Sequence, residues 1–279
     1  MRKGQNPNRQ VIVDGYAPIV LSVITHLPDL KDYHKDRLNV VKCCLETMRA
    51  NAGADNFQVL VWDNGSCDKL THWLKRSYQP DFLITGPNLG KTTARASILR
   101  MLPDKTIVNC ADDDMFYYPN WLKAHLEVMT VYPNVGTVSG WPVRTQFRFH
   151  NHSTKAWGQK MAILEQGRFI SPQEDRDFCT SIGRDYDYQV KTSLTDMDYR
   201  MNYRGVMTYA TGHHCQFLGR AGTLAPLDEF STEAMRSERY FENKVDQAGY
   251  LRLTTYKRYT RHIGNVLDPE LEELWQKLR

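Results

Sequence analysis

The chain of 279 residues carries 36 Lys and Arg against 32 Asp and Glu, a formal net charge of +4, and 41% of its residues are hydrophobic. This balance predicts a folded globular protein with a sizeable core and excludes a disordered or fibrous chain. No apolar run approaches the ~18 residues of a membrane span, and no apolar stretch follows the basic N-terminus, so we expect neither a transmembrane nor a secreted protein. The six cysteines show no C-x-x-C spacing. We expect them to be reduced, as in a cytoplasmic protein.

Short apolar runs alternate with helical patterns in the first half of the chain. The runs are 18–25, 57–62, 82–85 and 107–110, and the helical segments that follow them lie at 38–50, near 68–78, near 90–101 and from Pro119 onward. Strands that alternate with helices predict an α/β fold, with a mostly parallel central sheet flanked by helices. In such folds, ligands bind at the carboxyl ends of the strands.

The second half has a weaker pattern. A fifth strand is predicted at 135–139, and the region 140–230 that follows shows little periodicity. Regular structure returns with a helix at 239–247, strands at 250–254 and 256–263, and an amphipathic helix after Pro269.

Two loops at predicted strand ends carry polar motifs. The second strand is followed by Asp63-Asn64-Gly65-Ser66, and the third by a loop that contains Asn88-Leu89-Gly90. Lys91 and Arg95 come next, four residues apart at the start of a helix, where both can face an anion. The loop is not a P-loop, because Thr85 stands where the first glycine of that motif is required.

Three consecutive carboxylates, Asp112-Asp113-Asp114, close the fourth predicted strand. Like charges at a buried strand end are costly unless a cation neutralises them. Mg²⁺ or Mn²⁺, bound by carboxylates and by substrate phosphates, fits this chemistry. The alternative is an acidic cap of the next helix, although that helix is predicted to begin only at Pro119.

Together, these motifs resemble the nucleotide-binding half of family 2 glycosyltransferases, which have the Rossmann-like GT-A fold. The resemblance covers residues 18–125 and includes Ala94-Arg95 and Pro119-Asn120-Trp121-Leu122. It implies a metal-dependent, inverting hexosyltransferase-type enzyme that moves a sugar from a nucleoside diphosphate, with UDP as the expected carrier, to an acceptor hydroxyl.

The same resemblance assigns roles to individual residues. Asp114 would bind the Mn²⁺ or Mg²⁺ ion, and His262, within His262-Ile263-Gly264, would join the metal sphere. The implied donor-binding residues are Thr25, Pro28, Asp63, Asn88, Gly90, Lys91, Arg95, Asp112 and Asp113.

The resemblance extends less closely into the C-terminal part. Counting back from Ala248-Gly249-Tyr250 puts Glu238 at the position of the catalytic base, although Ser237 replaces the first acid of the usual pair and Lys244 stands where arginine is usual. Asp196 and Asp198 are rival candidates for the base. His213 and His214 could contact the acceptor or the diphosphate, but neighbouring residues on a strand point to opposite faces, so at most one of them is expected to do so.

We therefore expect four segments: a polar tail (1–16), a nucleotide-sugar-binding half (17–140), an acceptor-binding and catalytic half of the same domain (141–265), and an amphipathic end helix (266–279). The acceptor is expected to be a glycan or a hydroxymethylated pyrimidine in DNA. DNA is considered because residues 128–164 contain no carboxylate but include basic residues, and because further basic residues lie near the end of the chain; they are Arg144, Arg148, Lys155 and Lys160, and Arg252, Lys257, Arg258 and Arg261. A solvated loop is the alternative reading of that stretch.

The end helix leaves a further choice open. Its apolar residues could contact a membrane surface or a second subunit, or pack on their own domain; they are Leu271, Leu274, Trp275 and Leu278. Two other functional classes also remain: a nucleotidyltransferase, although its Gly- and Arg-rich signature is missing after the first strand, and a non-catalytic module that binds nucleotide sugars or nucleic acid.

Overall fold

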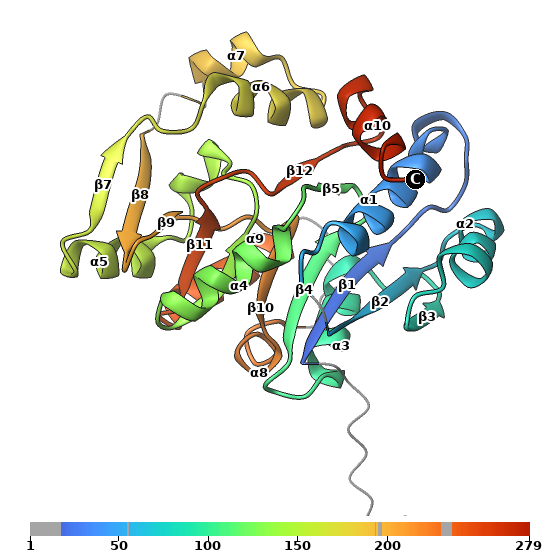
Figure 1. Cartoon of the computed structure of the whole chain (residues 1–279), viewed down its shortest axis with the longest axis horizontal. Coiled ribbons are helices and arrows are strands. Elements are labelled where there is room, and N and C mark those ends of the chain that lie inside the picture. The colour runs from blue at the N-terminus through green and yellow to red at the C-terminus, as the bar shows by residue number, and fades with distance from the viewer. Residues whose placement is uncertain (1–17, 55, 193, 195–196, 230–235) are drawn as a thin grey trace, which may run out of the picture.

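The computed structural model describes residues 18–54, 56–192, 194, 197–229 and 236–279 (Figure 1). Its centre is a ten-stranded sheet in the order β3-β2-β1-β4-β10-β6-β11-β9-β8-β7. The strands are β1 (Ile19–Thr25), β2 (Phe57–Asn64), β3 (Phe82–Gly86), β4 (Ile107–Asp112), β6 (Val135–Ser139), β7 (Leu164–Gly167), β8 (Asp198–Tyr203), β9 (Val206–Tyr209), β10 (Gln216–Arg220) and β11 (Leu251–Thr255).

The helices pack around this sheet. They are α1 (Arg37–Ala50), α2 (Asp68–Trp73), α3 (Lys91–Met101), α4 (Trp121–Val131), α5 (His152–Lys160), α6 (Pro172–Ser181), α7 (Tyr186–Thr192), α8 (Ala221–Leu224), α9 (Arg236–Gln247) and α10 (Pro269–Gln276). A π-helical segment, Leu74–Tyr78, continues α2, and short 3-10 helices lie at Asp32–His34 and Arg144–Arg148.

Most strands of the sheet run in one direction. Strands β3, β2, β1 and β4 are mutually parallel, and β6 and β11 form a second parallel pair. Strand β10 lies antiparallel between these two groups, and β9, β8 and β7 form an antiparallel extension. Seven of the ten strands described thus share a direction, because only β10, β9 and β7 are reversed. The predicted mostly parallel α/β class is confirmed.

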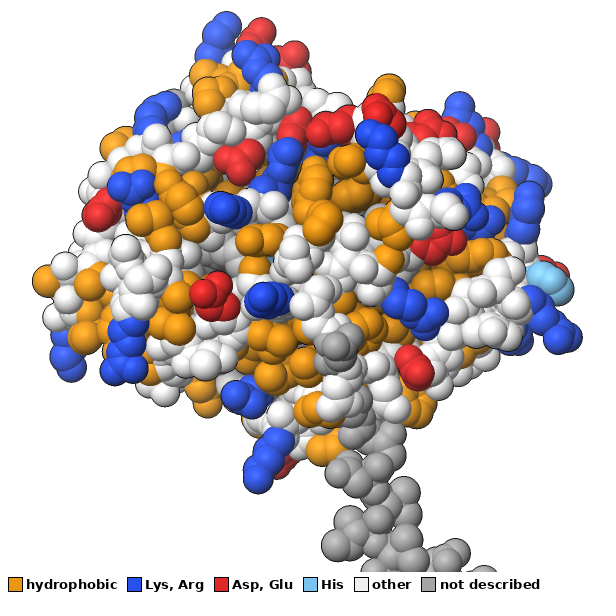
Figure 2. Space-filling view, viewed as in Figure 1, with side chains coloured by type: hydrophobic (Ala, Val, Ile, Leu, Met, Phe, Trp, Pro, Cys, Tyr) orange, Lys and Arg blue, Asp and Glu red, His pale blue; other side chains and the backbone are white. Residues whose placement is uncertain are grey.

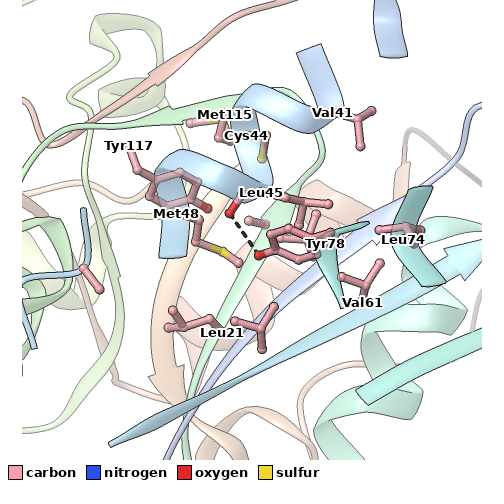
Figure 3. Close-up of a cluster of buried hydrophobic side chains, with 14 of the residues drawn as sticks. Leu21, Val41, Cys44, Leu45, Met48, Val61, Leu74, Tyr78, Met115 and Tyr117 are labelled. Carbon is pink, nitrogen blue, oxygen red and sulfur yellow. Dashed lines mark hydrogen bonds between the residues drawn. The ribbon is translucent and has the colours of Figure 1, made fainter. Parts of the chain in front are cut away.

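Alternating side chains of the central strands face two different helical layers, which makes the fold a three-layer sandwich. On one face, Leu21 and Val61 pack against α1, the α2 region and α4. Figure 3 shows this cluster, in which the Tyr78 hydroxyl donates a 2.9 Å hydrogen bond to the carbonyl oxygen of Leu45. On the other face, Val20 and Leu60 pack against α3, α8 and α9. The carboxyl ends of the strands between these layers remain available for a site.

The strand predicted at 256–263 is wrong in its length. Only β12 (Thr260–His262) is extended, and it pairs with an unpredicted short strand, β5 (Met115–Tyr117), in a separate two-stranded sheet. The hydroxyl of Thr255 donates a 2.8 Å hydrogen bond to the carbonyl oxygen of Lys257, which turns the chain away from the main sheet directly after β11. This departure carries β12 across to the end of β4 (Figure 1).

The end helix packs on its own domain. Leu271 and Trp275 are buried against Val40 and Cys43 of α1, and the Trp275 indole donates a 2.7 Å hydrogen bond to Glu46. The apolar face that could have contacted a membrane or a second subunit is therefore covered. In the described part of the chain, no helix is long and apolar enough to cross a membrane. All six cysteines lie within the described residues and are free thiols.

Candidate active site

Parallel register brings the polar strand ends to one edge of the sheet. Thr25 at the end of β1 lies opposite Asp63 of β2, and Ile24 lies opposite Asp112 of β4. Asp63 is buried and accepts hydrogen bonds from Thr25, Ser66 and the hydroxyl of Thr71 on α2. The two oxygens of this carboxylate therefore connect β1, the loop after β2 and α2 through hydrogen bonds.

The next loop is held by an amide network. The side chain of Asn64 donates a 2.9 Å hydrogen bond to Asn88 Oδ1 and accepts one of 2.9 Å from the backbone of Leu89. Gly90 follows with φ +83°, a left-handed conformation that favours glycine, and it starts α3. Asn88 and Pro28 are both exposed, so a nucleoside could reach them.

The three carboxylates at the end of β4 are neutralised by side chains of this chain. Lys91 Nζ lies 2.5 Å from Asp112 Oδ1. Arg37 pairs with Asp113 and, from Nη1 at 3.0 Å, with Asp114 Oδ2. Arg37 was not predicted as a site residue, because 77 residues separate it from Asp114 and nothing in the local pattern links the two.

The small β5-β12 sheet places His262 beside Asp114. His262 lies opposite Met115 in the register, and the backbone N–H of Ile263 donates a 2.7 Å hydrogen bond to the carbonyl oxygen of Asp114. The two side chains then face each other, with Nε2 of His262 3.4 Å from Asp114 Oδ2. Burial would raise the pKa of Asp114, but the charges of His262 and Arg37 hold it well below its usual range, so the carboxylate is ionised.

A divalent metal fits this pair in part. Among the residues that the structure describes, neither the buried Oδ1 of Asp114 nor the buried Nδ1 of His262 has a hydrogen-bond partner. Within the described ranges, no group of three or more His, Cys, Asp or Glu side chains is arranged to hold a metal ion. A Mg²⁺ or Mn²⁺ ion at Asp114 would therefore need oxygens from phosphates and water to complete its coordination, as is usual for these ions.

Arg95 lies beneath the surface of the site. Its side chain is 1% exposed and donates hydrogen bonds to both oxygens of Asp228, at 2.7 and 3.0 Å, and to Glu238 Oε2 at 2.6 Å. The guanidinium also lies over the ring of Phe241 at 4.5 Å. Arg95, expected near a nucleotide, is thus buried against two carboxylates, and one of them, Asp228, was not predicted from the sequence.

Lys91 connects the two halves of the site. Besides its contact with Asp112, Nζ lies 3.3 Å from Glu238 Oε1. Burial would raise the pKa of Glu238, but the charges of Lys91 and Arg95 lower it to about 2. Glu238 is thus an ionised carboxylate, nearly buried, at the edge where β4 ends.

The rival bases occupy different surroundings. Asp198 is fully buried, and its oxygens accept hydrogen bonds from Arg144 and from the backbone N–H groups of Phe169 and Ile170. This carboxylate is therefore enclosed by hydrogen bonds within the fold. Asp196 lies outside the described residues, as do the side chain of Ser237 and the predicted tail 1–16.

The predicted basic stretch is divided between the interior and the surface. Arg144 is buried between Asp175 and Asp198, whereas Arg148 and Lys160 are exposed. Of the arginines nearer the end of the chain, Arg252 is buried against Glu242, and Arg261 pairs with Asp268 and Glu270. Figure 2 shows basic and acidic side chains interspersed on the visible face, without one continuous positive patch. Arg144, Arg252 and Arg261 thus neutralise carboxylates of the fold.

Two cavities meet at His262. One, of about 700 Å³, is lined by Asp114, Ser181 and Gly264 among others. The second, of about 460 Å³, includes Glu238, His213 and His214 in its lining. The expectation that only one of these neighbouring histidines could face a ligand assumed that both lie on a strand. Both instead precede β10, line this cavity and have rings that stack at 5.0 Å. Burial lowers the pKa of His213 well below its usual value, so its ring is neutral.

A mostly parallel sheet with three aspartates at the end of a central strand defines the GT-A type of α/β fold. The chain belongs to glycosyl transferase family 2, whose sequence profile matches residues 34–189, more than half of the chain. No curated protein sequence matches it.

Similar solved structures include two glycosyltransferases. The mannosyltransferase PcManGT from Pyrobaculum calidifontis, in complex with GDP-Man and Mn²⁺, has 16% identity over 86% of this chain and 55% of that chain, with a TM-score of 0.49. Residues 1–349 of S. aureus TarS have 13% identity over 93% of this chain and 63% of that chain, with a TM-score of 0.49. The chain thus spans less than two thirds of either structure.

Proposed function

We propose that this chain transfers a sugar from a nucleoside diphosphate, expected to be UDP, to an acceptor hydroxyl, with inversion at the anomeric carbon and with a divalent metal. The observation that carries the proposal is the position of Lys91, whose Nζ lies 2.5 Å from Asp112 and 3.3 Å from Glu238. One ammonium group thus contacts both a residue of the donor motif and the candidate base, which come from opposite halves of the sequence.

In this proposal, the donor lies along the ends of β1, β2 and β4, within the segment 17–140. Pro28 and Asn88 are exposed at this edge and would border the nucleoside. Asp114 and His262 would hold Mn²⁺ or Mg²⁺. The metal would supply positive charge for the leaving diphosphate.

Glu238 is the base in this proposal and would accept the proton of the attacking hydroxyl. A carboxylate with a pKa of about 2 is ionised at neutral pH but is a weak base. Lys91 is half-exposed, whereas Arg95 is buried, so Lys91 is the cation that a diphosphate can draw away. Its departure would raise the pKa of Glu238 and strengthen it as a base when the donor is present.

The acceptor side would be formed by residues 141–265. A glycan carries a hydroxyl group that can act as the nucleophile, and so does a hydroxymethylated pyrimidine in DNA. For DNA, the base would have to leave the helix to reach Glu238, and binding would weaken steeply with added salt.

The first test is a thermal-shift series with nucleoside diphosphates and their sugars, each with and without Mn²⁺ or Mg²⁺. A ligand that binds only the folded protein raises its stability, by about 2.7 kcal/mol at a hundred times its Kd. We expect a metal-dependent shift for one nucleotide sugar, loss of that shift in Asp114→Ala, and no loss in Asp104→Asn, an exposed acid. No shift with any nucleotide sugar would reject the proposal.

The second test separates an enzyme from a binding module. Glu238→Gln keeps the shape of the side chain but cannot accept a proton. We expect transfer to fall by about 10²- to 10⁴-fold, the usual contribution of a general base, while the donor-induced thermal shift remains. Unchanged transfer would exclude Glu238 as the base. Donor binding without transfer in the parent protein, across glycan and DNA acceptors, would favour a non-catalytic module.

A further inference from the structure

The cavity beside Glu238 concentrates positive charge. Three arginines line it, and they come from three different elements: Arg148 from a 3-10 helix, Arg184 from the segment after α6, and Arg239 from α9. Among the described residues that line it, Glu238 is the only carboxylate, and it already pairs with Arg95. The described lining thus holds more arginines than carboxylates, and the inference below depends on Arg184 and Arg239 alone.

Two of these arginines differ in burial and ion pairing from Arg144 and Arg252, which lie in the same half of the chain (141–265). Arg144 and Arg252 are buried in ion pairs with carboxylates. Arg184 and Arg239 are exposed, and within the described residues neither forms an ion pair with a carboxylate. The guanidinium of Arg239 instead lies over the ring of Phe149 at 4.5 Å. Stacking of this kind orients the guanidinium while its N–H groups remain free to bind an anion.

We propose that this cavity is the acceptor subsite and that it takes an acceptor whose attacked hydroxyl lies close to a phosphate group. The inference rests on the proposed glycosyl transfer. Guanidinium groups match the oxygens of a phosphate in a bidentate geometry, whereas an uncharged sugar would leave the arginines without a counter-charge. The neutral ring of His213 adds no charge to this balance.

The size of the cavity limits what can enter it. About 460 Å³ is within the range of small-molecule sites and admits one phosphorylated sugar unit or one nucleotide, but not a double helix. In the transfer step, the acceptor oxygen would bond to the anomeric carbon, its proton would pass to Glu238, and the bond from that carbon to the diphosphate would break. The phosphate of the acceptor takes no part in bond changes and serves only to place the hydroxyl beside Glu238.

The test measures, by calorimetry, how tightly the full chain binds two pairs of compounds. The members of each pair differ only in the presence of a phosphate group. One pair is glucose 6-phosphate and glucose, and the other is 5-hydroxymethyl-2′-deoxycytidine 5′-monophosphate and its nucleoside. We expect the phosphorylated member of one pair to bind at least ~10-fold more tightly, since a hydrogen bond to a charged group contributes about that factor. The pair that shows the difference identifies the source of the phosphate.

Variants locate the binding. Arg184→Gln and Arg239→Gln should each weaken binding of the phosphorylated probe by about tenfold or more. Arg76→Gln, an exposed arginine beside α2, should leave it unchanged. Equal affinity for both members of both pairs would overturn the inference, as would equal losses in all three variants. Competition of the probe with UDP would also overturn it, because the arginines would then bind the donor diphosphate.

Failure of this inference is distinguishable from failure of the proposed function. Metal-dependent donor binding without any preference for a phosphorylated probe would reject the phosphate-bearing acceptor and leave glycosyl transfer in place. A preference that depends on Arg184 and Arg239, without any donor binding, would support an anion site here while rejecting the transferase.

Discussion

Arg95 donates a 2.6 Å hydrogen bond from Nη1 to Glu238 Oε2, although 143 residues separate the two in the chain. The remaining donors of the guanidinium bind Asp228, so one buried cation holds two carboxylates. The candidate base on α9 is therefore positioned by the first turns of α3, the helix that follows the donor loop. A change at Arg95 should affect both folding and the position of Glu238.

Arg95→Met should destabilise the protein strongly. The substitution leaves Asp228 buried without its ion-pair partner and Glu238 with Lys91 alone, and breaking such a pair usually costs about 3–5 kcal/mol. Urea unfolding at pH 7 measures the loss. The double variant Arg95→Met with Asp228→Asn removes one stranded charge and should recover part of the stability. A loss of less than about 1 kcal/mol in the single variant would show that the buried charges have other partners.

Lys91→Gln should move the acidic limb of the pH–rate profile to higher pH. Burial raises the pKa of Glu238, and Lys91 and Arg95 lower it to about 2. Removing the Lys91 charge takes away part of the lowering, so the base becomes protonated at a higher pH. The profile of kcat/KM against pH measures this shift. Lys69→Gln, an exposed lysine on α2, is the control. An unmoved acidic limb would mean that Glu238 does not govern it.

Gly264→Ala should destabilise the loop that follows His262. Gly264 has φ +81°, and an added Cβ would overlap the carbonyl oxygen of Ser181 at the end of α6. Gly249→Ala is the matched control, because Gly249 has φ +80° and no atom within 4 Å of an added Cβ. The control should lose about 1–2 kcal/mol from the left-handed conformation alone. Thermal unfolding should show a clearly larger loss for Gly264→Ala; equal losses would mean that the loop moves away from α6 freely.

The stability of the folded protein should fall as the pH drops from about 6.5 towards 4, because His125 binds a proton more readily in the unfolded chain. Burial lowers the pKa of His125 from 6.5 to about 4. Between these values the unfolded chain binds a proton that the folded chain does not, so acid favours unfolding. The contribution is about 2 kcal/mol between pH 7 and pH 5, since each pKa unit equals about 1.4 kcal/mol.

Urea unfolding at pH 7 and pH 5 tests this prediction. The loss of stability between the two pH values should be smaller in His125→Gln than in the parent protein. His72→Gln, at an exposed histidine of α2, should show the parent's loss. Identical losses in the parent protein and both variants would contradict the prediction.

The parallel core and the location of the acidic strand end could be predicted from the sequence. The apolar runs of β1, β2 and β4 and the helices between them are local patterns, and the chain order of such units places their carboxyl ends together. The acidic motif Asp112-Asp113-Asp114 follows one of these runs directly. Its position at the sheet edge could therefore be predicted without knowing which distant residues contact it. By contrast, β5 was not predicted and β12 was predicted too long, because each is only three residues and their limits depend on their pairing with each other.

The roles of the charged residues were decided by tertiary structure alone. Arg144 and Arg148 are four residues apart in the same short helix, yet Arg144 is buried between Asp175 and Asp198 while Arg148 is exposed at the cavity beside Glu238. The sequence by itself determined the fold class and the strand ends that carry the donor motif, because apolar periodicity and chain order are local properties. Only the folded chain decided which cations neutralise which carboxylates, since an ion pair depends on distance and burial in space, which residue spacing along the chain does not encode.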